Sequence, residues 1–376
     1  MNGPSNLHRL PGIWRASSNV LVAVWLLIAI FPIAWLVVMS VKLPIDAFAP
    51  NIFDVLGGPE TKAQIGGLST YDLALLILTV ILTASVHSAR RFLFRPFADT
   101  TGELKVGGVI LSYLTTALTL GVGALLVTPW VGTALERLTP DGPLSQPLLG
   151  ATLQHFRAVW IDNAFYVHLQ NSLLITGGVV AISLTIGALA GYGLARKSSQ
   201  IAFWILIIAL VFRALPHSTL VTGYLPPFIE LGLYGQQFAV IIVLVAINQP
   251  FTIWMLRSFF TNVPSSLDEA AMVDGATRLQ AFWHVIMPVM WPGVITTGLF
   301  SFMLAYNDYL VAALLLDGQS QTMVPAIMQY FNRETTLTDQ LEAIAAAVSI
   351  TGPLFILVLV FQKQIVSGLT QGAVKG

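Results

Sequence analysis

Long apolar runs separated by short polar segments dominate the pattern of this chain. Eight of these runs are candidate membrane-spanning helices, at residues 19–41, 71–88, 106–130, 171–195, 201–222, 237–257, 289–314 and 344–362. A helix needs about 20 mostly apolar residues to cross a bilayer, so the run at 71–88 is the shortest candidate. Because only helices and closed barrels satisfy their backbone in lipid, runs of this length predict an all-α, polytopic membrane helical bundle.

The composition agrees with a membrane location. Of the 376 residues, 56% are hydrophobic and 10% are charged, and the mean hydropathy is +0.78. A soluble domain usually carries about 25% charged residues, so the expected solvent is a lipid bilayer. The net charge of zero indicates no nucleic-acid partner. The absence of cysteine excludes a disulfide framework, a thiolate metal site and a cysteine nucleophile.

The basic residues are distributed unequally between the loops that eight spans would create. With the N-terminus inside, twelve Lys and Arg residues fall on the inner flanks and five on the outer flanks, with Arg213 in or near a span. Since cytoplasmic loops carry an excess of Lys and Arg, this asymmetry predicts both termini in the cytoplasm. The cluster of Arg90, Arg91 and Arg95 lies inside only if the runs at 71–88 and 106–130 both cross.

A polar and amphipathic segment, DEAAMVDGATRLQAFWHVIMP at 268–288, separates two of the apolar runs. Ser266 and Glu269 have the spacing of a capping box, and Gly275 accepts the positive φ that often follows a helix. Thr277 and Gln280 repeat the capping spacing. An apolar face follows at Leu279, Phe282, Trp283 and Ile286. The pattern predicts a helix–glycine–helix hairpin outside the bilayer, ended by the proline that closes the segment.

Periodicity leaves two interpretations of this hairpin open. It is either an ordinary loop in which Glu269 only caps a helix, or a helix with small alanines beside acids that enters a groove on another protein. The segment also resembles the EAA loop of ABC importer permeases, although Val285 and Met287 stand where that family has Ile and Leu. The resemblance implies a coupling helix that docks on a cytoplasmic ATPase subunit, where Glu269 pairs with a basic group. The coupling residues would be Asp268, Glu269, Ala270, Ala271, Asp274, Gly275 and Pro288.

Other segments are similar to carbohydrate permeases of the maltose-transport type, in particular to the subunit with a short Gly-rich tail. They are NSL at 171–173, GYGLAR at 191–196, YNDY at 306–309 and the tail at 367–376. The resemblance predicts three parts: 1–42 with the first span, an insertion at 43–159 with two extra spans and a periplasmic loop, and a permease core at 160–376 containing the loop at 264–288. Six core helices are usual in that family, so the role of the insertion stays open.

The resemblance implies transport of a sugar, glycoside or polyol rather than catalysis. The expected partners are a second permease subunit, two copies of a cytoplasmic ATPase subunit, and a periplasmic or extracellular solute-binding protein. The sequence contains no G-x-x-x-x-G-K-[ST] loop, so ATP and Mg are expected on the ATPase and no cofactor on this chain. The expected location is the bacterial cytoplasmic (inner) membrane.

Few ionisable or strongly polar groups lie inside the predicted spans, and such groups are costly enough that a functional role is the first hypothesis. Asn307, Asp308 and Tyr309 could contact a hydroxyl-rich sugar, but they could equally bridge helices or cap a broken one. Arg213 could line the pathway, pair with Asp308 or extend to the interface. No cluster of His and acidic residues has metal-ligand spacing, so no metal site is predicted.

Two other function classes predict different sequence features. An ion-coupled secondary transporter of a small polar solute would show midplane ion sites and inverted repeats, and it leaves the hairpin unexplained. An intramembrane enzyme would need a nucleophile paired with a base, or metal ligands. Only Asp308, Arg213 and His217 are available for that chemistry within the spans.

Overall fold

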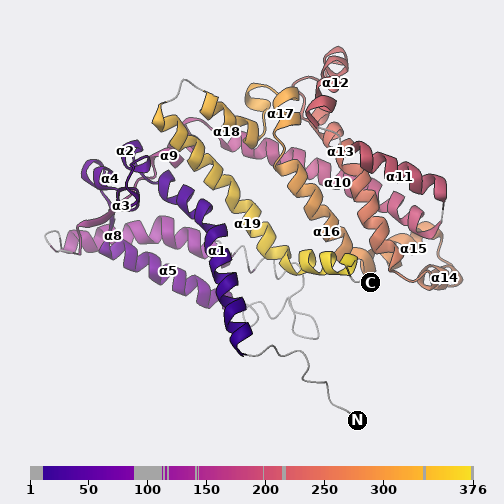
Figure 1. Ribbon diagram of the computed structural model, residues 1–376, viewed down its shortest axis with the longest axis horizontal. Coiled ribbons are helices and arrows are strands. Elements are labelled where there is room, and N and C mark those ends of the chain that lie inside the picture. Colours follow the sequence, from indigo (N-terminus) through magenta and orange to yellow (C-terminus); the bar gives the residue numbers. More distant parts are fainter. Residues whose placement is uncertain are drawn as a thin grey trace, which may run out of the picture. The chain divides into compact units, whose positions relative to one another are not determined.

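The computed structural model of the protein describes residues 12–88, 112, 115–116, 118–139, 142, 144–197, 199–213, 217–332 and 336–373 (Figure 1). The chain divides into two compact units. One comprises residues 1–162 and 333–351, and the other residues 163–332 and 352–376. The three-part division predicted from the sequence remains a prediction beside these two units.

The first unit contains short helices and a small sheet between longer apolar helices. In chain order its elements are α1 (Gly12–Ser40), α2 (Pro44–Ala47), α3 (Ile52–Gly57), α4 (Pro59–Gln64), β1 (Gly67–Ser69), α5 (Thr70–Ser88), η3 (Gly123–Val127), α8 (Thr128–Leu138), β2 (Pro147–Gly150), α9 (Gln154–Arg157) and η4 (Ala158–Asp162). The sequence pattern did not predict the sheet, in which β1 and β2 pair antiparallel with Gly67 opposite Gly150. A Cβ atom at Gly67 would lie 1.9 Å from the carbonyl oxygen of Leu149, so only glycine permits this pairing.

A buried lysine ties the short helices of this unit to the sheet. Lys42 is 3% exposed, and its Nζ donates to the carbonyl of Leu56 at 3.0 Å and to that of Gly150. Burial lowers the pKa of Lys42, while the carboxylate of Asp46 acts in the opposite direction. Asp46 in turn accepts hydrogen bonds from the backbone and hydroxyl of Thr61, each at 2.6 Å. These contacts satisfy charges that would otherwise be costly to bury.

The second unit is a helical bundle. Its elements are α10 (Tyr166–Arg196), α11 (Gln200–Arg213), α12 (His217–Glu230), α13 (Gln237–Thr261), α14 (Ser266–Val273), α15 (Arg278–Ala281), η5 (Phe282–Ile286), α16 (Met287–Tyr306), α17 (Leu310–Leu315), η6 (Gly318–Ser320) and α18 (Met323–Asn332). The last helix of the chain, α19 (Leu337–Ala373), begins in the first unit and ends in the second. In Figure 1, α14 and α15 lie at one end of the bundle and α12 and α17 at the other.

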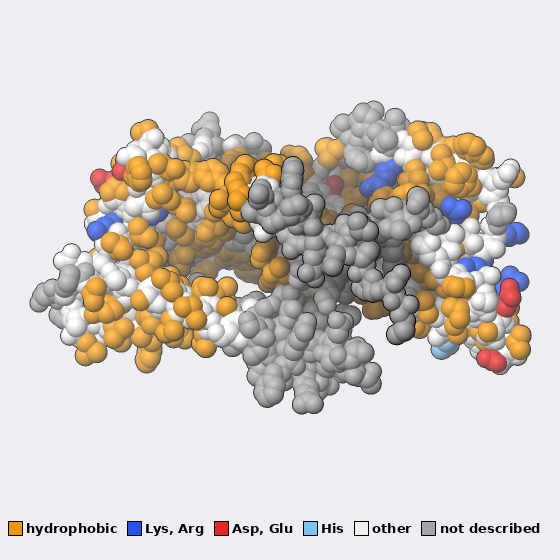
Figure 2. Space-filling view, turned by 60° about the horizontal axis from the view of Figure 1, so that its bottom comes forward, with side chains coloured by type: hydrophobic (Ala, Val, Ile, Leu, Met, Phe, Trp, Pro, Cys, Tyr) orange, Lys and Arg blue, Asp and Glu red, His pale blue; other side chains and the backbone are white. Residues whose placement is uncertain are grey.

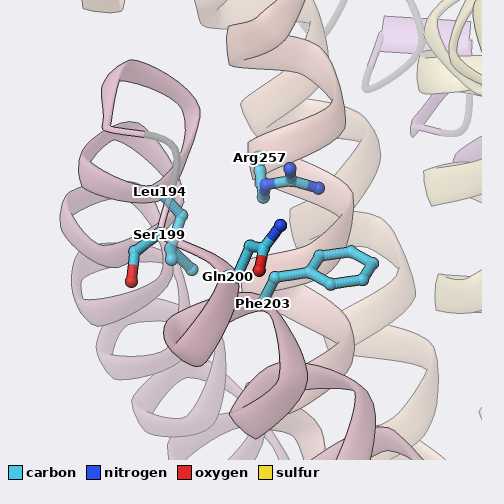
Figure 3. A pocket seen from close by; sticks show the side chains of 5 residues that line it. All are labelled: Leu194, Ser199, Gln200, Phe203 and Arg257. Carbon is cyan, nitrogen blue, oxygen red and sulfur yellow. The ribbon is translucent and has the colours of Figure 1, made fainter.

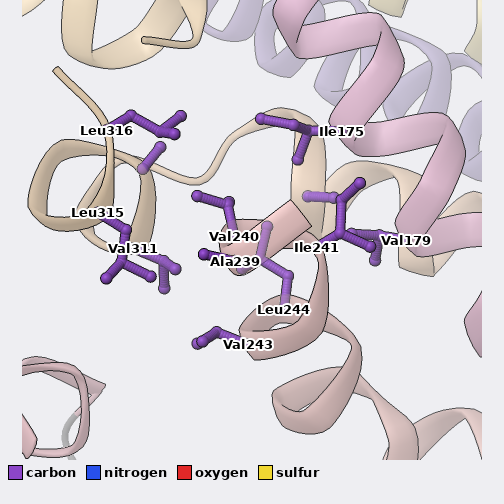
Figure 4. Packing of buried hydrophobic residues seen from close by; sticks show 12 residues of the cluster. Ile175, Val179, Ala239, Val240, Ile241, Val243, Leu244, Val311, Leu315 and Leu316 are labelled. Atoms are coloured by element: carbon purple, nitrogen blue, oxygen red, sulfur yellow. The ribbon is translucent and has the colours of Figure 1, made fainter. Parts of the chain in front are cut away.

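Helices α10 and α13 form the centre of this bundle. Val179 of α10 and Ala239 and Val240 of α13 have no exposed surface, and they pack with Leu315 of α17 in one apolar cluster (Figure 4). Farther along, Gly191 lies against the backbone of α13, because a Cβ atom there would lie 3.0 Å from the backbone nitrogen of Arg257. Small residues let helices in lipid approach to van der Waals distance, so the G-x-x-x-G pair at 187 and 191 marks helix contact, as expected.

Among the described residues, five helical segments are long and apolar enough to cross a membrane: 17–40, 166–196, 237–261, 278–306 and 337–362. Shorter apolar helices lie at 70–85 and 200–213. Hydrophobic side chains cover much of the visible surface and charged groups are few (Figure 2). Such a surface is expected where the surrounding solvent is lipid. Much of the predicted run at 106–130 falls outside the described residues.

The predicted run at 289–314 is not a single helix, because α16 ends at Tyr306 and α17 starts at Leu310. Hydropathy averaged over a span does not place this break, since apolar residues flank it on both sides. The predicted run at 201–222 lies partly in α11 and partly in α12, and its residues 214–216 fall outside the described part of the chain.

Candidate functional site

The segment between α13 and α16 forms the predicted helix–glycine–helix hairpin. Helix α14 ends in a Schellman motif, in which the amide of Ala276 donates to the carbonyl of Ala271 at 3.0 Å and that of Gly275 to Met272 at 3.1 Å. Gly275 has φ of +89°, a conformation that glycine adopts without a steric penalty. Thr277 and Gln280 then form the predicted capping box at the start of α15.

Three local details differ from the sequence prediction. The Ser266–Glu269 capping box is absent, because α14 begins at Ser266 and the N-cap residue, Ser265, makes no side-chain cap. Pro288 does not end a helix but stands in the first turn of α16, where its missing amide is tolerated. The π-helical turn η5 changes the helical phase, so Phe282 and Ile286 are buried whereas Leu279 and Trp283 are exposed.

Asp268 fixes α14 to the rest of the unit. Its Oδ2 lies 2.7 Å from Nε of Arg196, and its Oδ1 accepts a hydrogen bond from the hydroxyl of Tyr192 at 2.5 Å. Both partners belong to the last turns of α10. The two charged side chains are 19% and 11% exposed, so the ion pair is largely removed from solvent. The hydrogen bond from the Tyr192 hydroxyl to this carboxylate is charge-assisted, and such bonds are roughly twice as strong as neutral ones.

Arg196 also binds the end of α13. Its Nη1 donates to the carbonyl of Phe260, in the last turn of that helix, at 3.2 Å. It also donates to the carbonyl of Val263, just after the helix, at 2.9 Å. The ring of Tyr192 packs against the rings of Phe260 and Phe282, with centroids 5.6 and 4.9 Å away. Helices α10 and α13, the hairpin and η5 therefore meet at one cluster of side chains.

The other side of α14 is open. Glu269, Ala270 and Asp274 are exposed, and so are Met272 and Val273, at 38% and 87%. The seven predicted coupling residues thus divide by position: Asp268 and Ala271 face this chain, and the others are accessible. Sequence reasoning did not select Met272, Val273, Tyr192 or Arg196. The aromatic and basic positions of GYGLAR offered a signal for the last two.

The polar residues predicted for a substrate pathway lie where α16 gives way to α17. Asp308 Oδ2 accepts the backbone amide of Ala312 at 3.0 Å, so its carboxylate caps the first turn of α17. The amide of Asn307 donates to the carbonyl of Met303 at 2.9 Å. Asn307 and Tyr309 are exposed and Asp308 is half-buried. The geometry supports the capping alternative for Asp308 and leaves Asn307 and Tyr309 accessible.

Arg213 has a partner that the sequence did not indicate. Its guanidinium lies 4.7 Å from the ring centroid of Phe251 in α13, which is the geometry of a cation–π contact. The alternative of an ion pair with Asp308 is not found. Within the described part of the chain, no group of three or more His, Asp or Glu residues is arranged to hold a metal ion.

The comparisons with known proteins agree with this architecture. Residues 183–371 match the family described as "Binding-protein-dependent transport system inner membrane component", and they include the whole hairpin and its anchor on α10. The chain belongs to this family. It is a permease subunit of a binding-protein-dependent ABC importer and a multi-pass protein of the inner membrane, and in this family the ATPase is a separate subunit. This assignment replaces the secondary-transporter and enzyme alternatives.

Several curated relatives match well over half of this chain. The trehalose/maltose transport system permease protein MalG of Thermococcus litoralis is 36% identical over 238 residues, which are 62% of this chain and 85% of the relative. The trehalose transport system permease protein SugB of Mycobacterium tuberculosis is 33% identical over 69% of this chain and 95% of the relative. The diacetylchitobiose uptake system permease protein DasC of Streptomyces coelicolor is 31% identical over the same shares.

Proposed function

We propose that this permease forms half of a carbohydrate pathway and receives the motion of an ATPase subunit through the hairpin at 264–288. The observation that carries the proposal is the two-sided construction of α14. One side is held by Asp268 on the end of α10, and the other side is free to enter a partner. A lever needs both a fixed attachment and a free contact surface.

The free side of α14 has the chemistry of a docking surface. Met272 and Val273 are apolar and exposed, and the carboxylates of Glu269 and Asp274 lie on the same helix and at its C-cap. A helix with apolar anchors bordered by acids fits a groove with an apolar floor and a basic rim. Glu269 is the residue assigned to a basic group on the ATPase. Ala270 is small enough to allow close approach of the groove wall.

The substrate class rests on the relatives, which are named as carriers of trehalose, maltose or diacetylchitobiose. Asn307 and Tyr309 are the accessible polar and aromatic groups at the break between α16 and α17, where a sugar hydroxyl and an apolar sugar face would find partners. Asp308 shapes this break by capping α17. Arg213, stacked on Phe251, contributes a fixed positive charge to the wall of the pathway.

The proposed topology has about eight spans, with six in the core and two in the insertion, and both termini in the cytoplasm. The excess of Lys and Arg on the inner flanks supports it. The proposed partners are a second permease subunit, two ATPase copies that bind ATP and Mg, and an external solute-binding protein. The Gly-rich tail at 367–376 would reach the ATPase, but its side chains lie outside the described residues.

Charge reversal of Glu269 tests the coupling role. In Glu269→Lys, we expect the ATPase subunit to be lost on purification of the assembled transporter and sugar uptake to stop, because a lysine would face a basic rim. The matched control is Glu230→Lys, the same reversal at the end of α12, at the opposite end of the bundle (Figure 1). Normal ATPase recovery and uptake in Glu269→Lys would refute the coupling role.

A further inference from the structure

A cavity of about 190 Å³ lies where α10 ends, α11 begins and α13 approaches its own end. It is lined by Leu194, Ser199, Gln200, Phe203 and Arg257 (Figure 3). This is the end of the bundle that carries the hairpin, and therefore the cytoplasmic end in the proposed topology. The function proposed above does not use this cavity.

A second cavity, of about 340 Å³, adjoins the first and shares Leu194 with it. It runs between α11 and α13. Its lining is Leu194, Ala202, Ile205, Leu206, Ala209, Ala246, Gln249, Pro250 and Ile253. Gln249 is the polar member of this described lining, and its amide nitrogen is turned to α10, where it donates to the carbonyl of Ser183 at 3.4 Å. The second cavity is thus an apolar groove that meets the first at Leu194.

Arg257 makes the first cavity electropositive. Its guanidinium lies 5.4 Å from the ring centroid of Phe203, and within the described ranges it forms no ion pair. Neither cavity has an Asp or Glu among its described lining residues. The first turn of α11 also begins here, and the positive end of its helix dipole adds to the charge of the arginine, while the amide of Ala202 is already capped by Ser199 Oγ. An anionic group is the complement of such a cavity.

We propose that the two cavities form one site for an anionic phospholipid of the cytoplasmic leaflet. Its phosphate lies beside Arg257 and Gln200, and an acyl chain fills the groove between α11 and α13. The assignment of the leaflet rests on the proposed topology. A free inorganic anion would use the polar cavity alone and leave the apolar groove unexplained. A helix of the partner permease would cover the groove without needing the cationic end.

The surroundings of the groove also favour lipid. Ile201, Trp204 and Ile205 of α11 are 76%, 60% and 63% exposed, so the helix presents an apolar surface beside the groove. In a multi-pass membrane protein such a surface contacts acyl chains or another subunit. A phospholipid held there by its phosphate would join α11 to the end of α13, the helix whose last carbonyls receive Arg196.

Native mass spectrometry of the purified whole transporter tests the proposal. Phosphatidylglycerol, phosphatidylcholine and inorganic phosphate are added in separate titrations. We expect phosphatidylglycerol to bind more tightly than phosphatidylcholine. In Arg257→Gln the preference should fall at least about fivefold, the contribution of one basic residue near an anionic lipid. Arg257→Lys should keep most of it, and Arg137→Gln, which removes an exposed charge in the other unit, should keep all of it.

A second variant distinguishes a lipid from a small anion. Ala209→Phe narrows the apolar groove and should weaken phosphatidylglycerol binding without affecting assembly, which is checked by recovery of the ATPase. Unchanged phosphatidylglycerol binding in both Arg257→Gln and Ala209→Phe would overturn the proposal. If inorganic phosphate bound as tightly as phosphatidylglycerol, and Ala209→Phe had no effect on phosphatidylglycerol binding, the lipid site would be replaced by a small-anion site.

A further experiment asks whether the partner permease covers the groove. The variant Ile205→Cys, in a chain that has no native cysteine, is tested for crosslinking to the partner permease, and efficient crosslinking would also overturn the lipid site. Glu269→Lys should leave lipid binding by the membrane subunits unchanged. The coupling role and the lipid site can therefore fail independently.

Discussion

Asp268→Asn isolates the charge that holds the coupling helix. Asparagine has nearly the same volume and still accepts a hydrogen bond from Tyr192, so the substitution mainly removes the attraction to Arg196. An exposed ion pair is worth about 0–1 kcal/mol, and breaking a fully buried one costs about 3–5 kcal/mol. With side chains 19% and 11% exposed, this pair lies between these limits. We therefore expect α14 to lose about 2–3 kcal/mol of local stability.

Hydrogen exchange of the backbone amides in α14 measures this loss directly. The amides of Glu269, Asp274, Gly275 and Ala276 form intrachain hydrogen bonds that break when the helix opens. A loss of about 2–3 kcal/mol corresponds to exchange roughly 30- to 150-fold faster, because every 1.4 kcal/mol is a factor of ten. The assembled transporter should also show weaker coupling of ATP hydrolysis to the solute-binding protein, since the lever loses its attachment.

The neighbouring residue provides the control. Glu269→Gln removes an exposed carboxylate from the same turn, so the exchange rates of α14 should stay within about twofold of the original. The double variant Asp268→Asn with Arg196→Met should be less destabilised than the sum of the two single variants, because the pair is then absent rather than broken. Unchanged exchange in Asp268→Asn, or equal acceleration in Glu269→Gln, would refute the assignment of Asp268 as the anchor.

Two further predictions concern packing and pH. Gly191→Ala should lower the free energy of unfolding by about 1–3 kcal/mol, because the new Cβ would lie 3.0 Å from the backbone nitrogen of Arg257. The control Gly193→Ala, where no atom lies within 4 Å of the new Cβ, should be neutral. Equal thermal unfolding midpoints for the two variants would contradict this packing. Burial lowers the pKa of His155 below its ordinary value of 6.5, although its hydrogen bond with the Lys42 carbonyl opposes the shift. The neutral imidazole is therefore favoured on folding, so stability is complete above pH 6.5 and falls as the pH drops through the lower folded value. His155→Gln should remove this dependence in a melting series from pH 8 to 5, and an unchanged pH profile would count against it.

Patterns within one segment predicted much of the local structure. The spacing of Thr277 and Gln280 predicted a capping box, and Gly275 predicted the positive φ after α14, because these features depend on residues a few positions apart. The Ser266–Glu269 box failed for a local reason as well: the helix starts at Ser266, one residue earlier than a box with Ser266 as N-cap requires. The π-helical turn η5, which alters the face of the second helix, has no marker in the periodicity.

The amino-acid sequence by itself determined the solvent of this protein, its helical class and the existence of the hairpin, because hydrophobicity, helix length and capping depend on residues near one another in the chain. Only the tertiary structure decided which side of the hairpin is free. Asp268 and Glu269 are adjacent acids with the same local signals, yet one is held by Arg196 and by Tyr192, a residue 76 positions away, and the other is exposed. That difference depends on which helix ends meet in space, because burial and ion pairing are set by three-dimensional neighbours that no local pattern specifies.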